Sequence, residues 1–499
     1  MITMDFTAVL SLDITTVLVF VFTFLLVFYS TKRRPGIPPG PALFPVVGNL
    51  PHLASRDVLK RLDELRQRYG DIYALYIGKD LNIFLNGHMV IHDALVKRGT
   101  TFVGRPRRYL DKFLNIKFGI VSAMGSLWKE QRRFTQVSLT ELCFKNGGLP
   151  NERIINDEIS HVVNELQKTE GAINLEEYIN VSIFNAVCRI LLEHRYDFSD
   201  KTIRLILKTI RELAQDHRKE QVLASCMPFP LDLLSVQILG LSKRDLVVSL
   251  VEPLVSKIKN SEDRYSGNSF VSLYLKRIEE NKQSGIQDSF SEMQLDFTLF
   301  DMMVAGSETT ANTIRWILLY LIRKPSIQEN MYQEISKVIG TETPSICDRE
   351  NLPYVEAVIL EGLRIQAVAP LGIPHTVLED IVFHGYVFPK NCTVMMNLSS
   401  VCLDPDIWPE PKEFKPERFL SEDGTQIHVP KEFIPFSLGQ RACLGETFAR
   451  VELFLYVTTL VQTFNFLPEI KGEMPKLDGI LGVTWSPQSF KVRALKRAT

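Results

Sequence analysis

Residues 436–445 read FSLGQRACLG, and this stretch decides how the rest of the chain is interpreted. It places one thiol, Cys443, between a glycine-containing loop and a helix that the sequence predicts from Glu446 to about Phe464. The thiol therefore faces unpaired backbone N–H groups and the positive end of the helix dipole, and both favour a thiolate.

The Cys443 thiolate needs more stabilisation than a helix terminus provides. Ionising a free cysteine at neutral pH, from a pKa of ~8.5, requires roughly 2–3 kcal/mol, whereas an exposed helix end contributes about 0.3–1 kcal/mol. A metal would supply the remainder, because a coordinating thiol is deprotonated. One thiolate with no Cys or His close to it in the sequence suits haem iron rather than zinc or an iron–sulfur cluster.

The composition is that of a large globular protein. The chain has 499 residues, of which 45% are hydrophobic, and its formal net charge of −1 does not indicate nucleic acid as a partner. Length alone predicts about three domains, yet no repeat or flexible linker follows residue 42, so we expect one domain over residues 43–499. The polar stretches 261–269 and 279–291 are either linkers or, as we prefer, loops between helices. Seven cysteines without a C-x-x-C pair indicate a reducing compartment rather than a disulfide framework.

The amino-terminal region predicts a membrane anchor. Residues 14–30 contain no charge, and as a helix they would span about 25 Å, close to the thickness of an endoplasmic reticulum bilayer. The alternative is a cleaved signal peptide. Asp5 and Asp13 stand where a signal peptide carries lysine, and no A-x-A site follows, so we prefer an uncleaved anchor.

The segment after the apolar run predicts orientation and a hinge. The basic run KRR at 32–34 places everything downstream in the cytosol by the positive-inside rule. The proline-rich stretch 35–41 forms a stiff, non-helical spacer. We therefore expect an anchor at residues 1–31, a basic and proline-rich hinge at 32–42, and a cytosolic catalytic domain at 43–499.

The catalytic part predicts a mainly α fold with a smaller β portion. Residues 71–77 and 81–85 predict the two strands of a hairpin around the turn at 78–80, and residues 381–398 predict further short strands. The clearest helix runs from residue 291 to residue 323, and the pattern Ser291-x-x-Gln294 fits a capping box at its start.

The middle of that helix contains AGSETT at 305–310, which packing alone does not require. The helix is apolar on most sides and should be buried, where unpaired polar groups are costly. Gly306 would let a flat group approach the helix backbone, and a hydroxyl could bond back to the helix and open a groove. Glu308 and Thr309 are then either a proton-delivery pair beside a cofactor that binds dioxygen or a satisfied polar patch that bends the helix.

A further charged pattern predicts a structural cluster. A helix over residues 353–369 places Glu361 and Arg364 on one face. Arg418 follows in an irregular segment rich in Pro and Trp, which regular hydrogen bonds cannot hold. A Glu–Arg–Arg cluster with charge-assisted bonds could hold it, and we prefer this structural role to a catalytic one.

The order of these motifs resembles that of the cytochrome P-450 haem-thiolate monooxygenases over essentially the whole chain. The pair Glu308–Thr309, the E-x-x-R helix, the PERF segment at 416–419 and the Cys443 loop follow in the order of that family. The loop matches the family pattern F-x-x-G-x-R-x-C-x-G at every fixed position.

The details resemble microsomal, animal family-2 enzymes. The anchor and the proline hinge are typical of microsomal members, and WKEQRRF at 128–134 is similar to the family-2 sequences. The segment EGLRIQ at 361–366 departs from the E-x-Q-R usual among them, so the resemblance assigns neither the subfamily nor the substrate.

The resemblance implies haem b with Cys443 as the axial ligand. It assigns to the haem propionates the residues Arg105, Trp128, Arg132, His375 and Arg441. Four potential cations and an indole N–H suit two carboxylates that would otherwise be buried unpaired. The alternatives are that Trp128 is plain core and that Arg132 lies on a solvated helix face.

The resemblance also implies an activity. The enzyme would insert one oxygen atom of O2 into a fatty acid, steroid or xenobiotic and reduce the other atom to water, with Glu308 and Thr309 relaying protons. The chain has no G-x-G-x-x-G, so electrons are expected from NADPH–cytochrome reductase, with cytochrome b5 as a further candidate. We assign the docking face to Lys129, Arg133 and Arg450, against the alternative of ordinary solvated charge.

Apolar segments predict where a lipophilic substrate would bind. The candidate walls are residues 118–121, Ala305, 371–373 and 481–483, and the apolar stretch 227–231 either dips into membrane lipid or belongs to the core. Two rival functions are a haem-thiolate isomerase or dehydratase that works without a reductase and a haem-based gas sensor. Glu308 and Thr309 disfavour both rivals.

Overall fold

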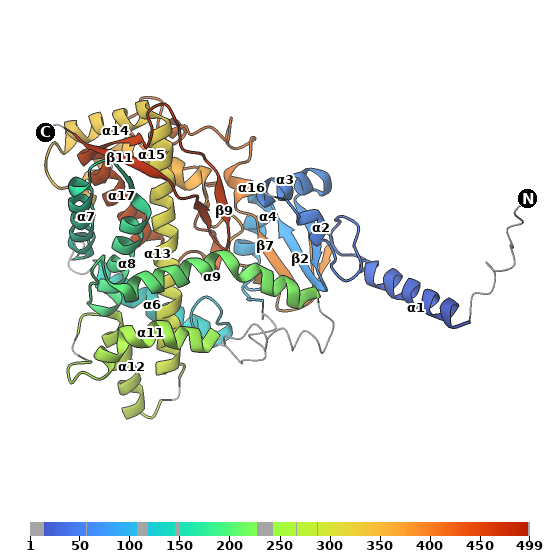
Figure 1. Cartoon of the computed structure of the whole chain (residues 1–499). Coiled ribbons are helices and arrows are strands. Elements are labelled where there is room, and N and C mark those ends of the chain that lie inside the picture. The colour runs from blue at the N-terminus through green and yellow to red at the C-terminus, as the bar shows by residue number, and fades with distance from the viewer. Residues whose placement is uncertain are drawn as a thin grey trace, which may run out of the picture.

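The computed structural model describes residues 14–55, 57–106, 118–144, 150–226, 243–265, 267–286 and 288–497. Helices make up most of this part of the chain, and the largest sheet lies to one side of them, next to the amino-terminal helices (Figure 1). The predicted fold class, mainly α with a smaller β portion, is confirmed. The stretch 227–231 lies outside the described residues.

The longer helices of the described chain include a central one, α13, on which α8, α17 and α11 pack. The longer helices are α1 (Ile14–Thr31), α3 (Val58–Tyr69), α6 (Gly125–Phe144), α7 (Pro150–Lys168), α8 (Leu175–Leu192), α9 (Lys201–Cys226), α11 (Lys243–Lys259), α12 (Phe270–Gln283), α13 (Glu292–Arg323), α14 (Pro325–Val338), α15 (Pro353–Ile365) and α17 (Glu446–Thr463). The shorter ones are α2 (Leu50–Leu53), α4 (His88–His92), α16 (Ser399–Cys402), a π-helical turn η2 (Asp93–Lys97) and the 3-10 turns η4 (Ile346–Asn351), η5 (Pro416–Phe419) and η6 (Gly439–Arg441).

The strands form two sheets and two separate hairpins. The larger sheet has the order β1-β2-β7-β4, from Ile72–Ile77, Asp80–Leu85, Thr393–Met396 and His375–Thr376, and only its β2–β7 pair is parallel. The smaller one has the order β3-β11-β8, from Ala172–Asn174, Lys491–Lys496 and Phe464–Pro468. The hairpins are β5 (Ile381–Phe383) with β6 (Tyr386–Phe388), and β9 (Gly479–Leu481) with β10 (Trp485–Pro487). The predicted hairpin and the further strands are confirmed.

Helix α13 begins and ends close to where the sequence predicts. The Ser291 side chain accepts a hydrogen bond from the backbone N–H of Gln294 at 3.2 Å, so it caps the helix as expected. The reciprocal half of the capping box does not form, because the Gln294 side-chain oxygen accepts from the Gly119 N–H at 3.2 Å instead of from the N–H of Ser291. The Gln294 amide donates to the Gly119 carbonyl (3.1 Å) and to Thr298 (3.1 Å). Figure 1 shows α13 running through the middle of the helical part, where α8 and α17 pack on it.

The predicted charged cluster is confirmed as a structural element. Arg364 donates two hydrogen bonds to the Glu361 carboxylate, at 2.7 and 2.8 Å, and both side chains are fully buried. Arg364 also donates to the Cys402 carbonyl at 2.6 Å, and Arg418 approaches Glu361 at 3.4 Å. The cluster therefore joins α15 to the irregular segment that follows α16.

Helix α15 ends at Ile365, four residues before the predicted end. The Gln366 side chain donates to the Tyr320 hydroxyl at 2.9 Å and accepts from Trp485 Nε1 at 2.6 Å. The backbone N–H of Trp485 donates to the Val368 carbonyl at 2.7 Å. These contacts with β10 replace the next helical turn, so the helix terminates early.

Helix α1 projects from the side of the molecule that carries the larger sheet (Figure 1). Its apolar side chains are exposed over the part from Val17 to Leu25. Among the described residues, we find no helix with both the length and the apolar character that membrane crossing requires.

Candidate active site

The loop before α17 places Cys443 next to the π-helical turn η2. The Cys443 N–H donates to the Phe436 carbonyl at 2.9 Å and closes the loop. Gly439 has a φ of +74°, and a Cβ there would lie 2.1 Å from the Leu95 carbonyl oxygen. Only glycine combines this backbone conformation with so close an approach, so the loop requires it.

Cys443 is accessible to solvent, although protein atoms surround much of its side chain. Burial raises the pKa of the Cys443 thiol, and the N–H of Gly445 lowers the pKa by less. The helix terminus therefore does not produce a thiolate in the chain by itself, in agreement with the expectation that a metal must supply most of the stabilisation.

Arg441 is held beside Cys443 by backbone carbonyls. Its guanidinium group donates to the carbonyls of Val103 (3.1 Å), Ile120 (3.2 Å) and Ala123 (2.6 Å). The same group lies 3.8 Å from the centre of the Trp128 ring, which is a close cation–π contact. Trp128 is buried, as the plain-core alternative also required.

Arg132 and Arg105 extend the cationic cluster on either side. Arg132 donates to the Ala442 carbonyl at 2.7 Å, so it is not a residue of a solvated face. Arg105 is buried, and it donates to the carbonyls of Val121, Ile373 and Pro374 at 3.1, 3.0 and 2.9 Å. Every side-chain hydrogen bond that the structure describes for Arg105, Arg132 and Arg441 goes to a backbone carbonyl rather than to a carboxylate.

The electrostatics of this cluster fit a dianionic group. Burial, with repulsion from Arg132, lowers the pKa of Arg105 to about 9. Burial, with repulsion from Arg105 and Arg132, lowers the pKa of Arg441 to about 8. Trp128 Nε1 is a buried donor without an acceptor among the described residues. Two carboxylates at this position would compensate both the repulsion and the unpaired donor, so the residues present fit the propionates of haem.

His375, the fourth potential cation of the predicted set, lies in an environment that determines its charge. Its Nδ1 lies 2.7 Å from the Phe102 carbonyl, and burial lowers the pKa of the imidazole to about 3. The ring is therefore neutral, with Nδ1 as the donor to the carbonyl. The cluster has three cations, and His375 contributes through hydrogen bonding instead of charge.

The acid and alcohol of α13 lie in different environments. Glu308 is buried, and its Oε1 accepts from Asn312 Nδ2 at 2.9 Å and from Ser486 Oγ at 3.4 Å. Thr309 is only partly exposed, and its hydroxyl donates to the Ala305 carbonyl at 2.7 Å. The sequence did not indicate Asn312 or Ser486, because a contact across 174 residues leaves no local pattern.

The interpretation of Gly306 is wrong. A Cβ on Gly306 would lie 3.1 Å from a methyl group of Val187, so this glycine lets α8 approach α13. The accessible side of α13 is the one with Ala305, which is exposed, and Thr309, which is partly exposed, although most of the helix is buried.

One loop links the two halves of the site. The Ile120 N–H donates to Asp301 of α13 at 2.8 Å, and the Ile120 carbonyl accepts from Arg441. The loop therefore holds the cationic cluster next to α13. Two of the predicted pocket walls therefore lie close together. The loop 118–121 is bonded to Asp301, one helical turn before Ala305 on α13.

The predicted docking residues divide into two kinds. Lys129 and Arg133 are exposed on α6. Arg450 forms an ion pair with Glu446 at 3.0 Å and lies over the Phe436 ring, so only 20% of its side chain is accessible. Arg450 therefore stabilises the amino terminus of α17, and its charge is not free for docking.

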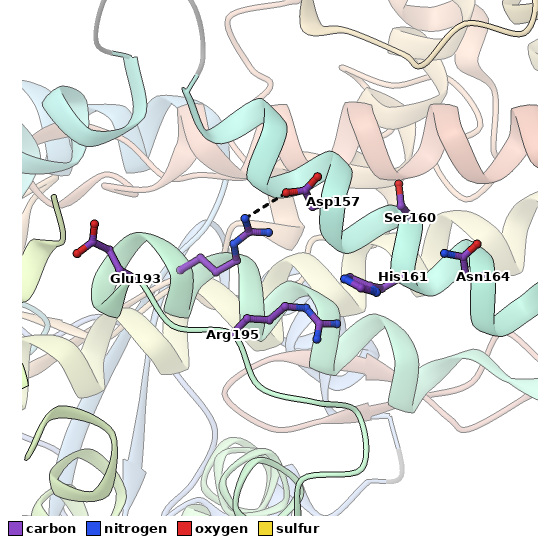
Figure 2. A pocket seen from close by; sticks show the side chains of 7 residues that line it. Asp157, Ser160, His161, Asn164, Glu193 and Arg195 are labelled. Atoms are coloured by element: carbon purple, nitrogen blue, oxygen red, sulfur yellow. Dashed lines mark hydrogen bonds and ion pairs between the residues drawn. The ribbon is translucent and has the colours of Figure 1, made fainter. Parts of the chain in front are cut away.

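A separate polar pocket of about 400 Å³ lies between α7 and the segment after α8 (Figure 2). It is lined by Asp157, Ser160, His161, Asn164, Arg189, Glu193 and Arg195. Its arginines are paired with acids, Arg189 with Asp157 at 3.1 Å and Arg195 with Glu158 at 2.9 Å. None of the predicted site residues lines this pocket.

The chain is mainly helical, and arginines and an unpaired indole N–H lie around one cysteine. These features define the class of haem-thiolate proteins. The family model "Cytochrome P450" matches residues 38–494, and the chain belongs to that family. The predicted haem cofactor and the predicted monooxygenase class are thereby confirmed.

The chain is similar to several animal relatives over most of its length. It is 34% identical to Cytochrome P450 2U1 of Mus musculus over 496 residues, which cover 94% of this chain and 93% of the relative. It is 33% identical to Cytochrome P450 2C23 of Rattus norvegicus, with 88% and 89% covered, and 32% identical to Cytochrome P450 2B19 of Mus musculus, with 92% and 94% covered. The resemblance to animal family-2 enzymes is confirmed.

Proposed function

We propose that this protein is a membrane-anchored monooxygenase that ligates haem iron through Cys443 and inserts one oxygen atom of O2 into a lipophilic substrate. The bound haem would supply the iron at which O2 is activated. The observation that supports the assignment best is the cluster of three arginines and an unpaired Trp128 donor around Cys443.

In this proposal the chain's own residues bind the cofactor and manage protons. Cys443 would ligate the haem iron, and Arg105, Arg132, Arg441 and Trp128 would donate hydrogen bonds to the propionates, with His375 as a neutral neighbour. The partly exposed Thr309 hydroxyl and the Glu308 carboxylate would hold and relay protons through water on the accessible side of α13. Ala305 and the loop 118–121 exclude bulk water from this side and contact an apolar substrate.

The proposed location is the endoplasmic reticulum membrane, with the catalytic domain facing the cytosol. The exposed apolar side chains of α1 and the basic run 32–34 support an anchor at residues 1–31 and the hinge at 32–42. The proposed substrate is lipophilic, namely a fatty acid, a steroid or a xenobiotic, as the resemblance to the family implies.

The proposed electron donor is NADPH–cytochrome reductase, with cytochrome b5 as a second donor. Lys129 and Arg133 are exposed next to each other, one helical turn apart on α6, and they suit an acidic partner surface. Since Arg450 is paired with Glu446, we restrict the docking proposal to the α6 residues.

Carbon monoxide spectroscopy tests the assignment of Cys443. The reduced, carbon monoxide-treated wild type should show the red-shifted Soret absorption that a thiolate ligand produces. Cys443→Ser should lose this absorption, and Cys347→Ser, which changes an exposed cysteine on η4, should keep it. A Cys443→Ser variant with the wild-type spectrum would overturn the assignment.

A further inference from the structure

Strand β10 lies along one stripe of α13. Glu308, Asn312 and Trp316 are spaced four residues apart, so they lie on one face of the helix. Trp316 Nε1 donates to the Trp485 carbonyl at 3.0 Å, and Asn312 Nδ2 donates to Ser486 Oγ at 3.0 Å. The helix face and the strand are therefore in register over two turns.

Trp485 fixes the position of this strand. Its ring is parallel to that of Trp316, with 6.2 Å between the centres and 6° between the planes. Its Nε1 donates to Gln366 at 2.6 Å, and its backbone N–H donates to Val368 at 2.7 Å. Since α13 and the end of α15 both hold Trp485, the next residue, Ser486, has little freedom to move.

Ser486 and Asn312 together hold one oxygen of the Glu308 carboxylate. Glu308 Oε1 receives the Asn312 amide at 2.9 Å and the Ser486 hydroxyl at 3.4 Å, and all three side chains are less than 10% exposed. Ser486 Oγ accepts from Asn312 while it donates to Glu308, so the three groups close a triangle.

Arg315 holds the far side of this triangle. Its guanidinium group donates to Asn312 Oδ1 at 3.0 Å and to the Pro487 carbonyl at 3.2 Å. It also forms an ion pair with Glu176 at 3.2 Å. The contact with Asn312 directs the amide N–H₂ group toward Glu308 and Ser486.

We propose that Ser486 is a positioning residue that sets the orientation of the Glu308 carboxylate for proton delivery. The proposal rests on the relay function of Glu308 given above. Ser486 touches neither substrate nor cofactor, and it acts through Glu308. Strand β10 also leads directly from the hairpin tip at 481–483, a predicted wall of the substrate pocket, so one short strand joins the substrate wall to the proton-relay acid.

The experiment measures the coupling of NADPH oxidation to product in the full-length enzyme reconstituted with reductase, with fatty acid and steroid probes. We expect Ser486→Ala to divert reducing equivalents to peroxide, with a loss of coupling of roughly three- to tenfold, the size expected for one hydrogen bond of ordinary strength. KM and the carbon monoxide spectrum should stay those of the wild type. Ser486→Thr, which keeps the hydroxyl, should restore coupling.

Two further variants separate positioning from simple loss of structure. Ser486→Cys is nearly isosteric with a weak donor, so it should fold and still lose coupling. Ser489→Ala, which removes a nearby exposed hydroxyl bonded to Asn174, should leave coupling unchanged. In the Glu308→Gln background, Ser486→Ala should add no further loss.

Each outcome is informative. Wild-type coupling in Ser486→Ala and Ser486→Cys, with impaired Glu308→Gln, would overturn the positioning role and leave the relay intact. Additive losses in the double variant would also overturn it, because Ser486 would then act without Glu308. Wild-type coupling in Glu308→Gln would overturn the relay itself, and the Cys443 spectrum would report on the haem assignment independently.

Discussion

At the scale of single residues, the indole of Trp128 shows how a cofactor site differs from ordinary core. Its ring packs against the Arg441 guanidinium group, while its Nε1–H has no acceptor among the described residues. A buried donor without a partner costs free energy in the chain alone and contributes favourably once a carboxylate accepts its hydrogen bond. The sign of its contribution therefore depends on whether the cofactor is bound.

We expect Trp128→Phe to have opposite effects on the two forms. The phenyl ring keeps the contact with Arg441 but removes the unpaired donor, so the apoprotein should be as stable as the wild type or more stable. The holoprotein should lose haem about 3- to 10-fold faster, as expected for one hydrogen bond of about 0.5–1.5 kcal/mol. Haem transfer to an excess of apomyoglobin measures the rate. Equal haem release in both proteins would contradict the assigned contact.

Glu452 on α17 is a second buried polar residue, and it leads to a pH prediction. Neither carboxyl oxygen has a partner in hydrogen-bond geometry among the described residues, although the Thr310 side chain lies near. Burial raises the pKa of Glu452 well above its usual range, and Thr310 lowers the pKa by less. The folded state therefore keeps the proton, whereas the unfolded state loses it above a pH of about 4.5. The contribution of Glu452 to stability falls as pH rises from that value.

Glu452→Gln should remove this pH dependence, because an amide does not titrate. We expect the variant to gain stability over the wild type as pH rises from 5 to 8, by roughly 1–3 kcal/mol at the upper end. Urea unfolding at several pH values measures the difference. The control is Glu165→Gln, in an exposed pair with Lys168, and it should show no such trend. Parallel curves for Glu452→Gln and wild type would show that Glu452 is ionised in the fold.

At the scale of elements, the Glu361–Arg364 pair connects α15 to a segment without regular hydrogen bonding. Arg364→Met should leave the Glu361 charge buried with only Arg418 near it, and the cost of breaking such a pair is about 3–5 kcal/mol. We expect a large loss of folded, haem-containing protein on expression, measured as the ratio of the haem absorbance to total protein. Lys168→Ala, which breaks an exposed pair, should change the ratio little. A normal ratio in Arg364→Met would contradict the structural role.

The elements that the sequence predicted well are those with local causes. The bounds of α13 follow from the Ser291 cap and from Pro325, and the β1–β2 hairpin follows from two largely apolar runs on either side of the turn at 78–80. The end of α15 was missed because Gln366 bonds Trp485, which is 119 residues away in the sequence. Gly306 was misread because the sequence does not show which neighbour, α8 or a cofactor, lies against it.

At the scale of the whole molecule, the site is assembled from segments that are remote in sequence. Arg105 precedes α6, Arg132 lies on α6, His375 lies on β4, and Arg441 and Cys443 precede α17. Family resemblance could group these residues, but spacing alone could not, since long-range packing brings them together. The neutral state of His375 could not be predicted from the sequence either. It results from the burial of the imidazole, which depends on the same long-range packing.

The anchor and the catalytic domain should be separable. Deletion of residues 2–31 removes the exposed apolar helix α1 and leaves the basic hinge. We expect the truncated protein to move from the membrane pellet to the supernatant in high salt, with an unchanged carbon monoxide spectrum. High salt is needed because the remaining basic residues are attracted to anionic lipid. A truncated protein that stays in the pellet would place the membrane contact elsewhere.

The hinge should matter for folding although the anchor does not. The Arg33 guanidinium group donates to the carbonyls of Pro41 (2.9 Å), Pro38 (3.1 Å) and Ala74 on β1 (2.9 Å), so it fastens the hinge to the larger sheet. In the truncated protein, Arg33→Ala should therefore lower the free energy of unfolding by about 1–3 kcal/mol, because these carbonyls lose a charged donor. The matched control is Arg34→Ala, an exposed neighbour, with an expected change within about 0.5 kcal/mol. Equal urea midpoints for the two variants would show that the hinge packs without help from Arg33.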